Sequence, residues 1–202
     1  MPLLHPLTAR PGLRLRLRQL RIPARMPLRI PVRLPARRPA VPPAKRVCDL
    51  IGTALLLVPA ALALLPAAAL LYAATRARVL VREPALGLGG RPFRAWRLRT
   101  EGAGRAGELV HRCALEGLPR LLNVARGEMS LVGPRPEART DHPERLLVRP
   151  GMTGLWQVSA RSDLPWAEMA LLDRHYVESH WLGMDLAILA QTPRAAYRQR
   201  HA

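Results

Sequence analysis

Residues 118–161 read LPRLLNVARGEMSLVGPRPEARTDHPERLLVRPGMTGLWQVSAR, and their composition differs from that of the rest of the chain. Glycines and prolines interrupt short apolar runs throughout this stretch, at Gly127, Gly133, Pro134, Pro136, Pro150, Gly151 and Gly154. Such punctuation is typical of loops with a defined shape rather than of long helices. The stretch therefore predicts short elements that are joined by tight turns.

Arginine side chains lie between these turns, at Arg135, Arg149 and Arg161. Arg135 is flanked by two prolines, whose fixed φ angles reduce the entropy that is lost when the guanidinium is held in place. A guanidinium is the side chain that best matches the geometry of a phosphate group. The pattern indicates a site for a phosphate-bearing ligand. A structural turn with a solvated arginine is the alternative for Gly133–Pro136 taken alone.

The net charge of +18 is concentrated near the N-terminus, because residues 1–46 contain twelve of the 32 lysines and arginines and none of the 14 acids. Ten of the 21 prolines lie in residues 1–44, where they prevent a continuous helix. We expect residues 1–44 to form a disordered, basic Pro/Arg-rich arm near anionic lipid headgroups. The alternative is that translation starts at Met26. Few aromatic residues accompany the arginines, so nucleic acid is not expected as a partner.

Residues 50–75 contain no charged side chain and are long enough to enter a bilayer. Pro59 and Pro66 interrupt this run, and a proline inside a helix removes a hydrogen bond and favours a kink. Basic residues flank both ends: Lys45 and Arg46 before the run, and Arg76, Arg78 and Arg82 after it. Because positive residues favour the cytoplasmic side, this symmetry predicts a membrane-associated, re-entrant kinked helix within residues 45–78. A kinked spanning helix is the alternative.

The remaining patterns predict a small mixed domain. Partial alternation of apolar and polar residues around Gly87–Gly90 predicts a β-hairpin within residues 79–100. Residues 101–117 predict a loop that passes into a short helix, and the C-terminal segment predicts two helices, the second ending at Pro193. The expected fold class is α+β, with a small helix-rich domain (79–202) attached to one re-entrant or membrane-spanning helix.

Several blocks occur in an order that together resembles a known family. They are Lys45-Arg46-x-x-Asp49, Pro66 within the apolar run, GLGGRPF (87–93), Arg97-Leu98-Arg99-Thr100, LPRLLNVARGEMSLVGPRPE (118–137), RPGMTGLWQVSAR (149–161), and Asp173, Tyr176, Asp185 and Thr192. This set is similar to that of the bacterial sugar transferases, the monotopic polyprenyl-phosphate phosphoglycosyl transferases. The resemblance covers residues 45–192. It implies that Lys45, Arg46, Asp49 and Pro66 belong to the membrane segment, and that residues 79–202 form a catalytic domain facing the cytoplasm at the bacterial inner membrane.

The resemblance also implies an activity, which is transfer of a sugar-1-phosphate from a UDP-sugar to polyprenyl (undecaprenyl) phosphate at the start of exopolysaccharide or glycan synthesis. In the family an aspartate attacks the β-phosphorus, nucleoside monophosphate leaves, and the next residue, a glutamate, helps to hold Mg²⁺. Glu116 and Gly117 stand at these positions. The expected nucleophile is therefore Glu116, and the expected Mg²⁺ ligands are Glu116 and Asp173. The alternative to Asp173 is that the substrate's own phosphates supply the missing oxygens. The residues expected to bind substrate phosphates are Arg99, Arg135, Arg149 and Arg161.

The Glu116-Gly117 pair is the main departure from the family pattern. A glutamate places its carboxylate about 1 Å from the position of an aspartate carboxylate, and misplacement on that scale can cost about 10²-fold in rate. Gly117 supplies no carboxylate at all. Ala85, Ala160 and a shorter segment before Glu116 are further departures. The alternative function is therefore a catalytically impaired homologue that binds nucleotide-sugar or lipid phosphate as a partner or regulator.

Overall fold

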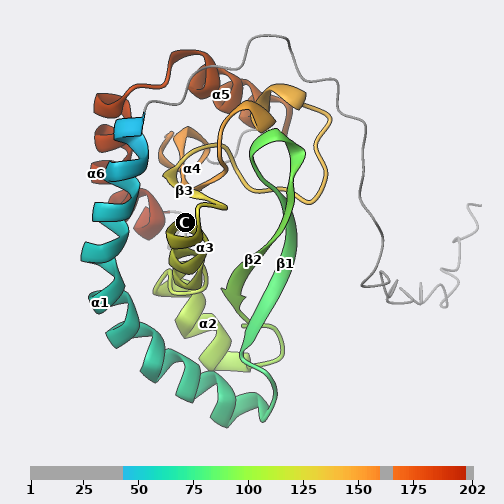
Figure 1. Ribbon diagram of the computed structural model, residues 1–202. Coiled ribbons are helices and arrows are strands. Elements are labelled where there is room, and N and C mark those ends of the chain that lie inside the picture. The colour runs from blue at the N-terminus through green and yellow to red at the C-terminus, as the bar shows by residue number, and fades with distance from the viewer. Residues whose placement is uncertain (1–42, 160–165, 199–202) are drawn as a thin grey trace, which may run out of the picture.

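A long helix and a β-hairpin form two sides of the molecule, with short elements packed between them (Figure 1). The structure is a computed structural model that describes residues 43–159 and 166–198. The helix is α1 (Pro43–Thr75), and the hairpin consists of β1 (Leu80–Leu86) and β2 (Pro92–Leu98). The α+β class, with one long apolar helix near its start, is confirmed. All but the last two residues of the predicted N-terminal arm lie outside the described residues.

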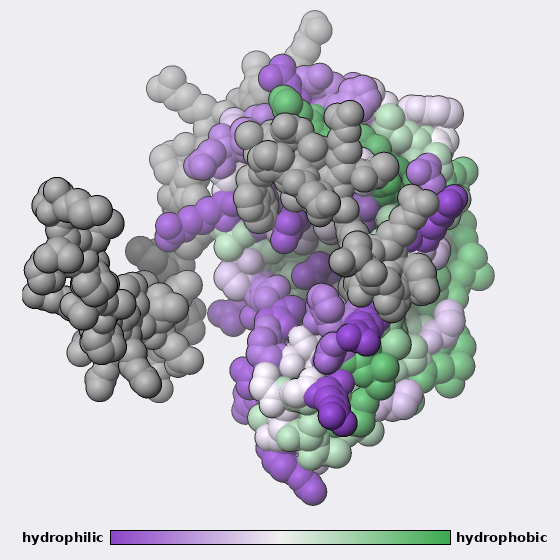
Figure 2. All heavy atoms as spheres, turned by 180° about the vertical axis from the view of Figure 1, so that it is seen from behind, coloured by the Kyte–Doolittle hydropathy of each residue, from purple (hydrophilic) through white to green (hydrophobic). Residues whose placement is uncertain are grey.

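Helix α1 continues through both of its prolines and curves round the domain (Figure 1). Its buried residues recur every four or seven positions, which places them on one stripe of the helix: Lys45, Asp49, Thr53, Ala60, Ala67 and Leu71. The rest of its surface is apolar and exposed, as at Leu55 (72%) and Leu62 (69%). By length and composition, α1 is able to cross a membrane. Figure 2 shows this hydrophobic surface as a band along one edge of the molecule.

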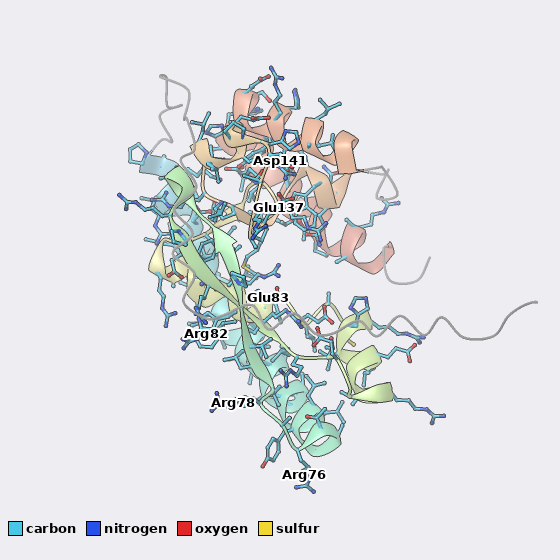
Figure 3. The ribbon with its side chains drawn as sticks, turned by 90° about the vertical axis from the view of Figure 1, so that its right-hand side faces the viewer. Arg76, Arg78, Arg82, Glu83, Glu137 and Asp141 are labelled. Carbon is cyan, nitrogen blue, oxygen red and sulfur yellow. The ribbon has the colours of Figure 1, made fainter. Side chains whose placement is uncertain are left out.

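The hairpin forms where the glycine-rich turn predicts it. Its turn is a single 3₁₀ turn, η1 (Leu88–Gly90), in which Gly89 has a φ of 68° that favours glycine. Antiparallel pairing runs from Leu80 opposite Leu98 to Leu86 opposite Pro92. Because side chains alternate along a strand, Glu83 lies on one face of β1 and Arg82 on the other, as Figure 3 shows. The two faces of the hairpin therefore carry different chemistry.

The central stretch folds into the short elements that its glycines and prolines predict. In chain order, the elements after the hairpin are α2 (Gly104–Arg112), η2 (Leu118–Arg120), α3 (Leu121–Arg126), β3 (Ser130–Val132), η3 (Pro143–Leu147), β4 (Gly151–Thr153) and α4 (Leu155–Val158). Gly127, with a φ of 83°, ends α3 in the left-handed conformation. Strands β3 and β4 pair in parallel, and a Cβ at Gly133 would lie only 2.4 Å from the Arg149 carbonyl oxygen. The loops pack too closely there for any side chain.

Two C-terminal helices, α5 (Trp166–Ser179) and α6 (Leu182–Arg198), complete the described chain. The prediction that Pro193 ends the second helix is wrong, because α6 continues past it. Pro193 is exposed, so water can solvate the carbonyl that its missing N–H leaves free. Helix α1 contributes to both hydrophobic cores, with Ala60 in the one beneath α3 and α6, and Ala67 and Leu71 in the one beneath α2.

Candidate active site

The first turn of α1 is fixed to the domain by a buried ion pair. Lys45 Nζ lies 2.6 Å from Asp185 Oδ2 on α6 and donates to the Val132 carbonyl oxygen at 3.1 Å. Tyr176 on α5 donates its hydroxyl proton to Asp185 Oδ1 at 2.6 Å. Burial, together with the nearby Asp185 charge, raises the pKa of Tyr176 well above its usual value, so the hydroxyl stays protonated. The network joins α1, β3, α5 and α6.

The next residues of α1 also face the domain. Asp49 accepts hydrogen bonds from the Ser130 hydroxyl and from the Leu131 N–H at 3.0 Å, both on β3. Arg46 donates to the carbonyl oxygens of Val124 and Ala125 at the C-terminal end of α3, where the Val124 oxygen also accepts from the Gly127 N–H at 3.0 Å. Of the residues assigned to the membrane segment from the sequence, Lys45, Arg46 and Asp49 thus hold α1 on the domain. Pro66 lies on its exposed apolar surface.

Glu116 lies in the loop between α2 and η2, with its carboxylate held from two sides. Thr100 donates its hydroxyl proton to Glu116 Oε1 at 2.6 Å, and His111 Nδ1 lies 3.1 Å from the same oxygen. The Glu116 carbonyl oxygen accepts from the Leu98 N–H at 3.0 Å, which fixes the backbone to the end of β2. Both of these side-chain contacts are made by Oε1.

Arg120, which the sequence analysis did not single out, is a half-buried cation whose charge interacts with that of Glu116. Its Nη2 atom lies 3.8 Å from Glu83 Oε2 on β1, and its Nε atom is buried without a hydrogen-bond partner. Burial lowers the pKa of the Arg120 guanidinium below its usual value, and the charges of Arg97 and Arg135 act in the same direction. Glu83 and Glu116 oppose this change. Arg120 therefore lies among all four charged groups.

The four arginines expected to bind phosphates differ in their settings. Arg135, in the loop after β3, lies 5.6 Å from the Trp156 ring and within electrostatic reach of Arg120. Arg149 donates from Nε to the Gly127 carbonyl oxygen at 2.9 Å, so it supports the end of α3. Arg99 is exposed. Arg161 lies outside the described residues. Of the four, Arg135 is the one that these charge interactions tie to the surroundings of Glu116.

Asp173, the second expected magnesium ligand, belongs to a different network. Its carboxylate pairs with Arg145, and Arg145 Nη1 also lies 2.7 Å from Glu137 Oε1. Burial raises the pKa of Asp173 to about 6, and the Arg145 charge limits the increase. The backbone N–H of Arg135 adds a further hydrogen bond that favours the ionised form. Asp173 therefore holds the backbone of the loop that carries Arg135.

A protein-held magnesium site is not formed by these residues. Mg²⁺ prefers several oxygen ligands in octahedral geometry, usually with one or two carboxylates. Within residues 43–159 and 166–198, no group of three or more His, Cys, Asp or Glu side chains is placed to hold a metal ion. Glu116 and Asp173 serve separate networks, and Gly117 offers no ligand. The residues present do not fit the ion, and magnesium stays a prediction from the resemblance.

An apolar groove of about 390 Å³ runs between α1 and the residues that follow Glu116. Its walls come from α1, both strands of the hairpin, η2 and α3, including Leu64, Leu65, Leu80, Leu98, Leu118 and Pro119. Leu118 and Pro119 follow the Glu116-Gly117 pair directly, and Leu98 donates to the Glu116 backbone. Residues that line the groove therefore stand two and three positions after Glu116 in the chain.

A carboxylate whose charge interacts with an arginine, close in the chain to the lining of an apolar groove, is a suitable arrangement for joining a phosphate-bearing group to a lipid. The chain belongs to the bacterial sugar transferase family, whose family model matches residues 41–199. The UDP-glucose:undecaprenyl-phosphate glucose-1-phosphate transferase of Caulobacter vibrioides is 34% identical over 180 residues, which cover 73% of this chain and 67% of that protein. The uncharacterized sugar transferase EpsL of Bacillus subtilis is 31% identical over 172 residues, covering 74% and 85%.

Higher identity is confined to shorter matches. The undecaprenyl-phosphate galactose phosphotransferase of Salmonella typhimurium is 42% identical over 101 residues, which are 46% of this chain and 21% of that protein. The exopolysaccharide production protein ExoY of Sinorhizobium fredii is 44% identical over 94 residues, which are 43% and 41%. The matches thus span about a fifth of the Salmonella protein and about two fifths of ExoY.

Proposed function

We propose that this protein transfers a sugar-1-phosphate from a UDP-sugar to undecaprenyl phosphate, and so begins the assembly of an exopolysaccharide or glycan. The observation that carries the proposal is the setting of Glu116, whose charge interacts with that of Arg120 and which precedes the groove residues Leu118 and Pro119 by two and three positions. Arginines suit the donor's diphosphate. The groove suits the hydrocarbon chain of a lipid acceptor. The names of the Salmonella and Caulobacter relatives describe transfer of a phosphorylated sugar that involves undecaprenyl phosphate.

The chemistry proceeds in two displacements at one phosphorus atom. Glu116 Oε2 attacks the β-phosphorus of the donor, the bond to the bridging oxygen breaks, and UMP leaves with the electron pair. A phosphate oxygen of the acceptor then attacks the same phosphorus, which releases the Glu116 carboxylate and forms a new diphosphate. Thr100 and His111 hold Oε1, so that Oε2 keeps one orientation. Arg120 and Arg135 offset the negative charge on the phosphoryl oxygens.

The contacts of α1 support a re-entrant arrangement at the cytoplasmic face of the inner membrane. A spanning helix separates its ends by the thickness of the hydrocarbon core, about 30 Å. Here Lys45 near the start of α1 and Leu71 near its end are both buried against the same domain. A domain in water that binds both ends keeps both on one side of the bilayer. The cytoplasmic side is the one that offers nucleotide-sugars.

The test is release of UMP from a panel of UDP-sugars by membranes that contain the protein and undecaprenyl phosphate. Glu116→Gln keeps the shape of the side chain but removes the nucleophile, so release should vanish. Glu108→Gln is the matched control, because Glu108 lies on the neighbouring helix α2 in an exposed pair with Arg112. Release that persists in Glu116→Gln refutes the nucleophile. No release from the wild-type protein, when donor binding is intact, favours the binding homologue.

A further inference from the structure

We propose that Arg120 binds the donor's diphosphate and supplies the positive charge that the resemblance assigns to a magnesium ion, so that transfer needs no divalent cation held by the protein. The inference rests on the proposed function, because it concerns the same diphosphate beside Glu116. It goes beyond the family pattern because it follows from residues particular to this chain.

Within the described residues, no group of three or more acidic, histidine or cysteine side chains is placed to hold a divalent cation at this site. Glu116 uses Oε1 for Thr100 and His111, which leaves one oxygen for both nucleophilic attack and any metal. Asp173 is buried against Arg145 in a separate network. Gly117 has no side chain. A metal held by one carboxylate oxygen would have almost its whole coordination shell supplied by water and substrate.

Arg120 is placed to bind an anion. It enters from the 3₁₀ turn η2, four residues after Glu116, and 22% of its side chain is exposed. Its contact with Glu83, at 3.8 Å, is longer than a hydrogen bond, and its Nε is buried without a partner. A buried N–H without a partner is costly, and a phosphate oxygen is a suitable acceptor for it. The guanidinium is thus held in position but incompletely hydrogen-bonded.

Positive charges near Arg120 favour the binding of an anion. The charges of Arg97 and Arg135 both act on Arg120, and Glu83 and Glu116 oppose them. Figure 3 shows Glu83 and Arg82 on opposite faces of the hairpin. Arg97 also forms ion pairs with Glu83 and with the exposed Glu101. The donor's diphosphate is attracted by the Arg120 guanidinium, and the charges of Arg97 and Arg135 act in the same direction.

Gly117 offers a way to restore the missing carboxylate. A Cβ at this position meets no atom within 4 Å, and the backbone φ of −86° suits any residue. Gly117→Glu therefore introduces an acid beside Glu116 without a steric clash. Combined with Arg120→Gln, it replaces the proposed arginine charge with the paired carboxylates that a magnesium ion needs. The wild-type protein, which has the arginine charge, can then be compared in the same fold with the double variant, which has the paired carboxylates.

The experiment measures transfer by the full-length protein in lipid nanodiscs, with excess EDTA or with millimolar Mg²⁺. Wild-type protein should work equally well in both. Arg120→Gln should lose about 10²-fold in rate under both conditions, as expected for loss of one donor to the charge that develops in the transition state. Arg120→Gln with Gly117→Glu should recover only with Mg²⁺. Arg174→Gln, which alters an exposed pair on α5, is the matched control and should behave as wild type.

Two further measurements do not depend on turnover. Calorimetric titration with UDP-glucose should give the same affinity for the wild-type protein in EDTA and in Mg²⁺, and a weaker affinity for Arg120→Gln. Electron paramagnetic resonance of Mn²⁺ without nucleotide should detect binding to the double variant only. Wild-type activity that is lost in EDTA and restored by Mg²⁺ overturns the inference, as does donor affinity that Arg120→Gln leaves unchanged.

The two proposals fail in different ways. If no preparation turns over but UDP-glucose binds without metal and through Arg120, the inference about Arg120 holds and the proposed transfer is refuted. If wild-type transfer occurs only with Mg²⁺, the transferase function holds and the inference about Arg120 is refuted.

Discussion

Replacing Lys45 by methionine should destabilise the protein more than any surface change of the same kind. Lys45 Nζ lies 2.6 Å from Asp185 Oδ2, and the two side chains are only 7% and 9% exposed. Methionine fills most of the lysine volume but leaves the Asp185 carboxylate buried with Tyr176 as its remaining hydrogen-bond donor in this network. Removing one partner of a buried ion pair typically costs about 3–5 kcal/mol. That is a large part of the roughly 5–15 kcal/mol that stabilises a folded domain.

The loss is measured by thermal unfolding in detergent micelles, where it should lower the melting temperature by roughly 6–20 °C for a domain of this size. Arg174→Met is the matched control, since Arg174 pairs with Glu178 at a position where both side chains are 60% exposed. Such exposed pairs contribute about 0.2–1 kcal/mol at most. Adding Asp185→Asn to Lys45→Met should recover part of the loss by removing the unpaired charge. A Lys45→Met melting temperature equal to that of the control would refute the reasoning.

Two other changes test separate features. Asp173 has a pKa of about 6 in the folded protein against 3.8 for the free side chain, so the folded state keeps this proton to a higher pH and loses stability as pH rises from about 4 to about 6. Asp173→Asn should abolish this contribution, which is on the order of 3 kcal/mol; an unfolding free-energy difference from wild type that stays constant across these pH values would contradict it. Leu62→Arg should lower the fraction that stays on membranes after a carbonate wash, because a charged residue in hydrocarbon costs about 2.5–3.5 kcal/mol. Leu171→Arg, at a 63% exposed position on α5, is its control, and equal retention of both would contradict a lipid-facing α1.

Local patterns were enough to predict the elements of this fold. The uncharged run 50–75 predicted α1, and Gly87–Gly90 predicted the hairpin turn. Gly127 ends α3 in the left-handed backbone conformation, which glycine adopts more readily than other residues. Each of these features depends on residues that are close together in the chain, so the sequence contains all the information that is needed.

Long-range pairing was not predictable in the same way. Lys45 and Asp49 look like flanking charges of a membrane segment, but their partners Asp185 and Ser130 lie 140 and 81 residues away. The sequence did not indicate Arg120 because its setting depends on Glu83, a residue of β1 that lies close to it only in the folded protein. The resemblance to the sugar transferase family identified Glu116 as a candidate, whereas its two supports, Thr100 and His111, come from the end of β2 and from α2.

The burial of α1 in both hydrophobic cores has a consequence for how this protein can be produced. Leu71 is fully buried, and Ala60 and Ala67 are 7% and 5% exposed, so the domain relies on α1 for part of its interior. A fragment of residues 79–202 would expose the apolar surfaces of α3 and β2 and leave Asp185 without its lysine. Detergent or lipid is thus a requirement of the catalytic unit itself, and a water-soluble version must be sought by redesigning the outer face of α1 and not by deleting the helix.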